Sequence, residues 1–393
     1  MKTPQFSRRA DGSESWKIRF RHRGKETSRT FASERGARRF ADMIDKLGLE
    51  RALEIVEART AESPSAAPTM REWCEQYIDT LTGVGNASLR DYRRYAQKNL
   101  GNLANIPIDL ITRTDIATWV NQTAAEKKPD GKPLSGKTIA NRHGFIAGAL
   151  NRAVRDELIK SNPCDATRLP RTVKLPMVFL THDEYLRFIG CFPTWRRPMV
   201  ATMFTTGLRW GELAALRVGD FDAERGTISV VQAWKDGGKE LGAPKTDKSV
   251  RTVAIAPEVI DMLTPLTVGR SPRDWLFTGR NGDWVRYHTF RKEAWVPAVK
   301  LANGEGKVRD GGRLLPTPSP LLGKRPRIHD ARHSCASWLL GAGVPINYVQ
   351  AHLGHESIQT TVDRYGHVMP GAQHAIRHAI SNAISAAHPM IEQ

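Results

Sequence analysis

The sequence has few cysteines, and they lie far apart. Cys74, Cys164, Cys191 and Cys335 form no C-x-x-C pair. The sequence therefore indicates neither a zinc site nor a disulfide framework. Isolated cysteines of this kind are typical of reduced thiols in a cytosolic protein.

A long apolar segment is also missing. No stretch approaches the roughly 20 apolar residues that a membrane-spanning helix needs. The N-terminal segment MKTPQFSRRADGSESWK has no apolar region of the kind that a secretory signal carries, and no basic amphipathic helix of the membrane-surface type stands out. We therefore expect a cytoplasmic protein without a membrane partner.

Acidic residues are scarce relative to basic ones. The 393 residues include 59 Lys and Arg but only 41 Asp and Glu, which gives a formal net charge of +18. A surplus of this size favours a polyanionic partner such as a nucleic acid. A generically basic protein remains the alternative, because net charge bears on association and not on fold.

The chain length predicts two or three domains, and the first predicted domain covers residues 1–62. Apolar and basic residues alternate over 16–20, which predicts a strand, and residues 27–31 can return as a second strand after a basic turn. Ser33 is a candidate N-cap of a following helix. Such a sheet suits a DNA groove, although a solvated strand face is an equal alternative. The basic residues that we expect to contact DNA here are Arg19, Arg21, Arg23 and Lys25.

A linker at residues 60–68, rich in Ser, Pro and Ala, leads to the second predicted domain, 69–170. Apolar spacing predicts four helices here, including one capped by Ser88, one opened by Thr114 and a longer one over 137–158. The alternative to DNA binding is a purely structural bundle. Basic residues on the edges of these helices are the candidate DNA contacts, namely Arg90, Arg93, Arg94, Lys137 and Arg142.

The third predicted domain covers 177–393 and is mainly α-helical with a small antiparallel sheet. Thr181 is a candidate helix cap, and residues 227–234 and 250–255 resemble strands. Residues 303–326 contain many Gly, Pro and Lys residues, which predicts an exposed loop. Residues 371–387 predict a tail helix that packs either on its own domain or on a neighbouring subunit. The predicted fold class is therefore multidomain α+β.

Four short motifs of the third domain contain candidate catalytic residues. TTGLRWGEL contains Arg209, PKTDKSVRTV contains Lys245, HDARHS contains His329 and Arg332, and LGHESIQTTVDRYGHV contains His355 and Tyr365. An Arg at the start of a helix can bind a phosphate with its planar guanidinium, and a Lys in a turn can protonate a leaving oxygen. A His and an Arg three residues apart on a helix share a face.

Each motif alone has a plainer explanation. Arg209 could pair with Glu212 or Asp220, because structural ion pairs are common, and Lys245 could lie in a solvated turn. A lone Tyr is far more often a packing residue than a nucleophile. No single motif therefore decides the function.

The order and spacing of the motifs resemble the tyrosine recombinases, specifically the phage-type integrases. TTGLRWGEL, HDARHSCASWLLGAG and LGHESIQTTVDRYGHV are each close to that family's sequence blocks. The first two predicted domains resemble its arm-type and core-type DNA-binding domains, so the resemblance covers nearly the whole chain. Ala331 departs from the family, which usually has Leu at this position.

The resemblance implies a role for each of six residues. Arg209 and Arg332 would bind the non-bridging oxygens of a phosphodiester, and His329 and His355 would add hydrogen bonds, with His329 accepting the tyrosine proton. Lys245 would protonate the departing 5′ oxygen, with Lys248 as a rival for that role. Tyr365 would be the nucleophile that forms a 3′-phosphotyrosyl bond. That bond stores the energy for ligation, so the reaction would need no ATP, metal or other cofactor.

The resemblance implies a site-specific recombinase that integrates a phage or mobile element and excises it with a partner. It implies a homo-tetramer on double-stranded DNA with core and arm sites, with a host DNA-bending protein and an excisionase as further partners. The location would be the cytoplasm of a bacterial host, at the nucleoid. The alternatives are a dimer-resolving recombinase or a transposon integrase, a type IB topoisomerase, and a non-catalytic DNA-binding regulator.

Overall fold

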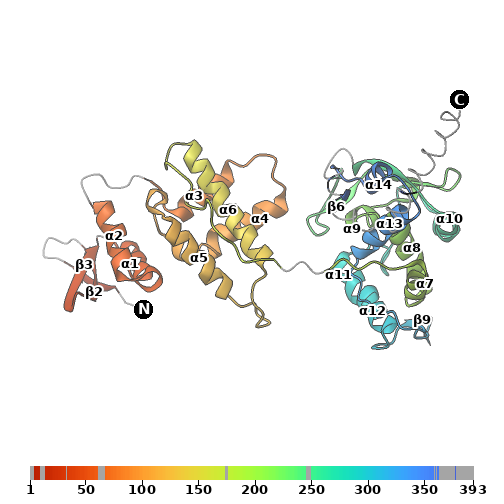
Figure 1. Cartoon of the computed structure of the whole chain (residues 1–393), viewed down its shortest axis with the longest axis horizontal. Coiled ribbons are helices and arrows are strands. Elements are labelled where there is room, and N and C mark those ends of the chain that lie inside the picture. Colours follow the sequence, from red (N-terminus) through yellow and green to blue (C-terminus); the bar gives the residue numbers. More distant parts are fainter. Residues whose placement is uncertain are drawn as a thin grey trace, which may run out of the picture. The chain divides into compact units, whose positions relative to one another are not determined.

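The computed structural model describes residues 4–8, 14–31, 33–60, 67–172, 176–244, 249–357, 359, 361–362 and 377. The chain divides into two compact units, Met1–Leu175 and Pro176–Gln393 (Figure 1). None of the helices in the described ranges is both long enough and apolar enough to span a membrane.

The first unit begins with a three-stranded antiparallel sheet. Strands β1 (Gln5–Arg8), β2 (Glu14–His22) and β3 (Lys25–Phe31) lie in that order. Alternate residues of β2 face opposite sides, so Ile18 and Phe20 are buried whereas Arg19 and Arg21 are exposed. The predicted pair of strands and the basic turn between them are confirmed, whereas β1 was not predicted from the sequence.

Helix α1 (Glu34–Leu47) packs on the buried face of this sheet. Phe40 is fully buried there, and its ring lies 5.7 Å from that of Phe20 and 5.2 Å from that of Phe31, centroid to centroid. Ser33 is the N-cap as predicted, because its hydroxyl accepts a hydrogen bond from the Gly36 N–H at 3.2 Å. The sheet therefore keeps one face in contact with α1 and presents the other, basic face to solvent.

The rest of the first unit is helical, as predicted. Helix α2 (Leu49–Thr60) is followed by α3 (Met70–Asp79), α4 (Asn86–Lys98), α5 (Arg113–Ala125) and α6 (Gly136–Arg155). The apolar faces of α3–α6 share one core with the sheet and α1, which includes Trp73, Trp119, Phe145 and Leu150. Residues 1–175 form one compact unit. The division of this unit into two domains near residue 62 stays a prediction.

Two of the predicted helix starts were wrong. Helix α4 begins after Gly85, which makes no side-chain cap, and Ser88 lies inside the helix. Helix α5 begins two residues earlier than predicted, because Thr112 and Asp115 form a reciprocal capping box. Thr114 cannot form such a box, because the residue three positions later is not a carboxylate.

The carboxylate of Asp115 also links α5 to α2. Asp115 is 8% exposed and accepts a hydrogen bond from the Arg51 guanidinium at 2.8 Å as well as from the Thr112 N–H at 2.9 Å. Arg51 also donates to the Leu110 carbonyl at 2.8 Å. One side chain thus starts α5 and attaches α2 to it.

The second unit is mainly helical and contains a small sheet. Strands β4 (Phe221–Asp222), β5 (Thr227–Val230) and β8 (Arg251–Ala254) form an antiparallel sheet, and β6 (Ala233–Lys235) pairs with β7 (Glu240–Gly242) in a hairpin. The predicted single strand over 227–234 is therefore two strands. The helices are α7 (His182–Gly190), α8 (Arg197–Thr206), α9 (Trp210–Leu213), α10 (Pro257–Leu263), α11 (Tyr287–Phe290), α12 (Val296–Ala302), α13 (Asp330–Gly341) and α14 (Ile346–Leu353).

The buried core of this unit is rich in aromatic rings from distant parts of the chain. Phe188, Phe204, Phe290 and Trp295 are each at most 3% exposed and contact one another through ring edges and faces. Thr181 caps α7 as predicted, in a capping box with Glu184. This core fixes α8 and α13, the helices that flank the candidate site.

Residues 303–326 are more ordered than the predicted loop. They contain the short hairpin of β9 (Arg309–Asp310) and β10 (Arg313–Leu314), and Leu322 is buried in the core. Lys324 binds Glu184 at 2.7 Å, which attaches the segment to α7. The predicted tail helix at 371–387 lies outside the described residues, apart from residue 377.

Replacing Asp115 with Ala should lower the free energy of unfolding of the first unit by about 2–3 kcal/mol, because Arg51 and the Thr112 N–H both lose their acceptor. Urea unfolding followed by tryptophan fluorescence measures this. Asp130→Ala is the matched control, because Asp130 is exposed and its carboxylate accepts a local hydrogen bond from the Lys132 N–H, so its effect should stay within about 0.5 kcal/mol. Equal effects of the two substitutions would contradict the role given to Asp115.

Candidate active site

Arg209 lies at the turn between α8 and α9. Gly207 ends α8 with φ of +62°, and a Cβ at this position would come within 2.7 Å of Leu353, so only glycine fits. Arg209 is the N-cap of α9, and its guanidinium donates to Glu212 Oε1 at 2.7 Å and to the Gly354 carbonyl at 2.9 Å. The Arg209 side chain is 40% exposed, so its guanidinium is held in place and still faces solvent.

Glu212 links Arg209 to a second arginine that the sequence analysis did not identify. Its carboxylate is 3% exposed and binds Arg251, which is 7% exposed, at 3.0 Å. Arg251 lies on β8 and also donates to the His352 carbonyl at 2.7 Å. Burial alone would raise the pKa of Glu212, but the charges and hydrogen bonds of Arg251 and Arg209 outweigh it and hold that pKa below its ordinary value.

Arg332 is buried in the first turns of α13. It is 2% exposed, and its guanidinium donates to the Gly207 carbonyl at 2.7 Å and to the Leu353 carbonyl at 2.7 Å. Arg332 and Arg209 therefore bind two successive carbonyls, those of Leu353 and Gly354, at the C-terminal end of α14. These carbonyls lack partners within the helix, so they are natural acceptors for cationic side chains.

His355 follows directly after this turn. It is 6% exposed, its N–H donates to the Gln350 carbonyl at 3.1 Å, and its Nδ1 lies 2.8 Å from the Thr361 hydroxyl. The Ser357 hydroxyl accepts from the Gln359 N–H at 3.2 Å. The backbone that positions His355 is thus the same turn that Arg209 and Arg332 bind.

His329 is the N-cap residue of α13 and is exposed. Its ring meets that of His333 edge to face, with centroids 4.7 Å apart. The two histidines border a cavity of about 580 Å³ whose rim also carries Arg291, Lys300, Arg325 and Arg327. An exposed imidazole in basic surroundings is accessible for proton exchange with a ligand or with solvent.

Two of the six predicted catalytic residues, Lys245 and Tyr365, lie outside the described residues, as does Lys248. The structure brings together three of the other four, because Arg209, Arg332 and His355 all contact or adjoin the turn at Leu353 and Gly354. In the described ranges, no group of three or more His, Cys, Asp or Glu side chains could hold a metal ion. The carboxylate that sequence reasoning treated only as a pairing alternative, Glu212, is central to the arrangement.

The predicted DNA contacts are basic residues of the first unit, and most of them are exposed. Arg19 and Arg21 lie on the outer face of β2, and Arg23 has φ of +48° in the turn before Lys25. Arg90, Arg93 and Arg94 are exposed on α4, where Arg94 pairs with Asp91 at 2.7 Å, and Lys137 is exposed at the start of α6. Arg142 differs, because it is only 12% exposed and binds Glu126 at 2.8 Å.

The geometry of these side chains defines a class of site. Two guanidiniums are fixed by carbonyl acceptors, one of them partly open to solvent, beside a buried imidazole in a strongly basic chain. Planar guanidiniums match the paired oxygens of a phosphate. The arrangement is therefore chemically suited to an anionic ligand such as a phosphodiester.

Comparison with known proteins identifies the family. The family model described as "Phage integrase family" matches residues 178–371. The chain is 29% identical to the ICEBs1 integrase of Bacillus subtilis (strain 168), over 61% of this chain and 64% of that protein. It is 27% identical to a protein named tyrosine recombinase XerC-like from Caldanaerobacter subterraneus, over 71% of this chain and 72% of that protein. Residues 178–371 therefore belong to the phage integrase family of tyrosine recombinases.

Solved structures share the fold. The Tn1549 transposon integrase in complex with transposon right end DNA superposes with a TM-score of 0.64 at 23% identity, covering 76% of this chain and 95% of that one. A lambda integrase tetramer bound to a Holliday junction superposes with a TM-score of 0.54 at 18% identity, covering 90% and 95%. The predicted fold class, including the N-terminal sheet module, is confirmed.

Replacing Glu212 with Gln should lower the free energy of unfolding of the second unit by about 3 kcal/mol at neutral pH, because two guanidiniums lose the charge that binds them. The pKa of Glu212 is depressed in the folded state, so its contribution is complete above the ordinary value of 4.5 and is lost as the pH falls through the folded pKa. The gap between the wild type and the variant should therefore narrow below about pH 4.5.

Urea unfolding at a series of pH values measures this gap. Glu258→Gln is the matched control, because Glu258 is exposed on α10 and its replacement should change stability by less than about 0.5 kcal/mol at any pH. A gap that stays constant down to about pH 3 would contradict the ionised pairing of Glu212.

Proposed function

We propose that the protein is a site-specific DNA integrase that breaks and rejoins double-stranded DNA through a 3′-phosphotyrosyl bond to Tyr365. It would integrate a phage or mobile element and, with a partner, excise it. The observation that supports this best is the anchoring of Arg209 and Arg332 on successive carbonyls, Leu353 and Gly354, with His355 next in the chain. This arrangement presents positive charge where a phosphodiester would be attacked.

In the proposed cleavage step, the Tyr365 oxygen attacks the phosphorus and gives its proton to His329. The bond from phosphorus to the 5′ oxygen breaks, and that oxygen takes a proton from Lys245. Arg209, Arg332 and His355 bind the non-bridging oxygens, which carry more charge in the transition state than in the substrate. Ligation is the reverse reaction, in which a 5′-hydroxyl attacks and the tyrosine leaves.

The proposed substrate is double-stranded DNA with core and arm sites, bound by a tetramer of this chain. The outer face of the β1–β3 sheet would contact arm DNA through Arg19, Arg21, Arg23 and Lys25, and the helical part would contact core DNA through α4 and α6. Two observations support this: these residues are mostly exposed, and the related lambda integrase tetramer has been solved on a Holliday junction. A host DNA-bending protein and an excisionase are proposed as further partners.

A transposon integrase or a dimer-resolving recombinase with the same chemistry is the second candidate. The likeness to the Tn1549 transposon integrase and to a XerC-like protein supports it. The module of β1–β3 and α1 precedes the helices of the first unit and favours an integrase, because it adds a second basic surface for a second class of DNA site.

Incubation with a nicked duplex that carries the core site should give a protein–DNA adduct that survives denaturation, and Tyr365→Phe should abolish it because phenylalanine has no nucleophilic oxygen. Gel electrophoresis under denaturing conditions measures the adduct. Tyr348→Phe is the control, because Tyr348 is 64% exposed on α14 and should leave the adduct unchanged. An adduct that persists in Tyr365→Phe would refute the mechanism.

Lys245→Ala should slow cleavage by about 10²–10⁴-fold, the usual contribution of a general acid, whereas Lys248→Ala should have little effect. A substrate with sulfur in place of the bridging 5′ oxygen should restore the Lys245→Ala rate, because a thiolate leaves without a proton. Single-turnover cleavage rates measure both effects. Rescue of Lys248→Ala instead would assign the role to Lys248, and no rescue of either would refute general-acid catalysis by these lysines.

A further inference from the structure

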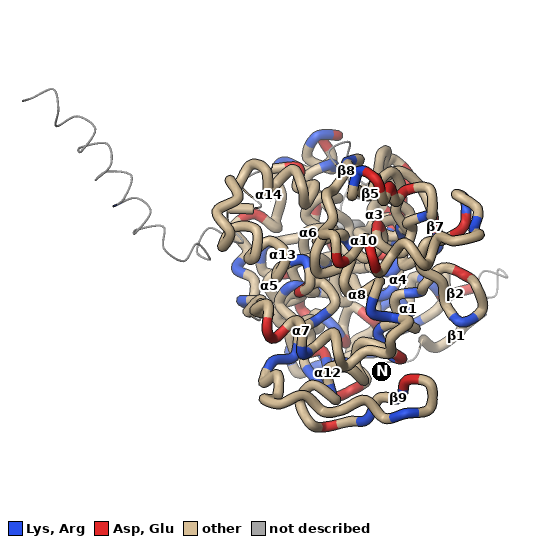
Figure 2. Tube along the Cα trace, turned by 90° about the vertical axis from the view of Figure 1, so that its right-hand side faces the viewer, with Lys and Arg blue, Asp and Glu red and all other residues tan. Residues whose placement is uncertain are grey.

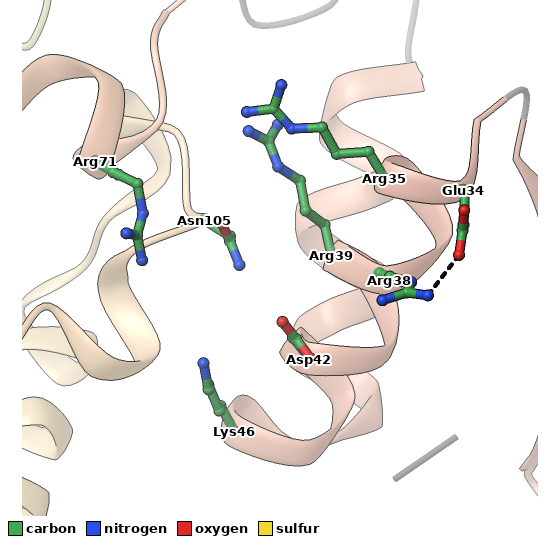
Figure 3. Close-up of a pocket in the computed structure, with 8 residues that line it drawn as sticks. All are labelled: Glu34, Arg35, Arg38, Arg39, Asp42, Lys46, Arg71 and Asn105. Carbon is green, nitrogen blue, oxygen red and sulfur yellow. Dashed lines mark ion pairs between the residues drawn. The ribbon is translucent and has the colours of Figure 1, made fainter. Parts of the chain in front are cut away.

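A basic cavity lies between α1 and α3 in the first unit. It has a volume of about 540 Å³. Figure 3 shows the side chains that surround it. Five are basic, two are acidic and one is an amide. They are Glu34, Arg35, Arg38, Arg39, Asp42, Lys46, Arg71 and Asn105.

The basic side chains reach the cavity because of the spacing along α1. Arg35, Arg39, Asp42 and Lys46 recur every three or four residues and so occupy one face of the helix. The opposite face, with Phe40, is buried against the sheet. Packing of α1 on the sheet therefore leaves its basic face turned toward the cavity. Figure 2 shows basic residues along α1.

Three of the five cations already have partners. Arg38 binds Glu34 at 2.6 Å, Arg39 binds Glu72 on α3 at 3.2 Å, and Arg71 donates to the Gln97 carbonyl at 2.9 Å. These contacts hold the arginines at the rim of the cavity and attach α1 to α3. The cavity is therefore bordered by charged groups whose positions are set by the fold.

Arg35 and Lys46 differ from these three. Both are exposed, and within the ranges that the structure describes neither side chain has a hydrogen bond or ion pair. Arg35 and Arg39 are four residues apart and extend in the same direction in Figure 3, an arrangement of like charges that costs stability in the absence of an anion. Asn105 adds a neutral amide at the opposite wall. The cavity thus combines fixed and available cations with an uncharged donor.

We propose that this cavity binds phosphates of a DNA backbone and is a DNA contact separate from the exposed face of the β1–β3 sheet. This rests on the proposed function. Arg, Lys and Asn side chains are typical phosphate ligands, and the lining contains no aromatic ring on which a base could stack. The basic face from Arg35 to Lys46 extends over roughly 16 Å of helix, which suits successive phosphates of one strand better than a single ion.

The site adds a second basic surface to the N-terminal module. The sheet carries Arg19 and Arg21 on the face opposite to α1, whereas Arg35 and Lys46 lie on the far side of α1. A duplex on the outer face of the sheet therefore leaves the cavity free for another DNA segment. The module contacts DNA on two sides.

The test uses the full chain and a short duplex of arbitrary sequence, with affinity measured over a range of salt concentrations. The double substitution Arg35→Ala with Lys46→Ala should reduce the slope of log Kd against log salt by about 1–2, since each phosphate contact contributes about 0.9. Raising the salt from 50 to 200 mM should weaken DNA binding more for the wild type than for the variant. The difference should be roughly three- to fourfold for each phosphate contact that the variant has lost. Arg35→Lys, which keeps the charge, should retain most of the wild-type slope.

Lys307→Ala with Arg313→Ala is the matched control, because it removes the same charges from exposed positions of the second unit. A slope that is unchanged in the test variant, or reduced equally in the control, would overturn the proposal. A rise in melting temperature with inorganic phosphate alone that is lost in the test variant, without a change in the DNA slope, would overturn it in favour of a free anion. Absence of DNA binding by the wild type would instead refute the proposed function.

Discussion

The second unit depends on the turn at the C-terminal end of α14, where two guanidiniums bind successive carbonyls. Arg332 reaches the Leu353 carbonyl from α13, and Arg209 reaches the Gly354 carbonyl from the start of α9. Gly354 adopts φ of +66°, and a Cβ there would come within 3.0 Å of Arg251. Segments about 125 and 145 residues apart are therefore joined through backbone acceptors, and His355 takes its place from the same turn.

Local signals in the sequence predicted much of this arrangement. The motif TTGLRWGEL indicated that Arg209 lies at the start of a helix, and HDARHS indicated that Arg332 lies on a helix. The contacts of Glu212 were beyond such signals, because its partner Arg251 lies 39 residues away on a strand. A buried ion pair of this kind depends on tertiary packing, and a sequence shows it only as two ordinary charges. Thr112 differs, because the T-x-x-D pattern of its capping box with Asp115 is local, and only the bond from Arg51 on α2 to Asp115 depends on tertiary packing.

The first unit separates two uses of basic residues that composition alone merges. Arg51 and Arg39 bind Asp115 and Glu72 and serve to attach α2 and α1 to the helices that follow. Arg19 and Arg21 are exposed on the sheet, and Arg35 and Lys46 border a cavity. The count of 59 Lys and Arg residues therefore overstates the number of cations available to a ligand, because some of them are paired within the fold.

At the candidate active site, by contrast, the basic side chains outnumber the carboxylates that bind them. Arg209 and Arg251 bind a single carboxylate, that of Glu212, whereas Arg332 binds the neutral carbonyls of Gly207 and Leu353. Burial lowers the pKa of His352 to about 4, and the charges of Arg251 and Arg332 contribute to the shift. The positive charge of the guanidiniums stabilises anions, and a phosphodiester or a tyrosinate is an anion. In the proposed reaction the same charges would also favour ionisation of the nucleophile, which needs such help because the free pKa of tyrosine is about 10.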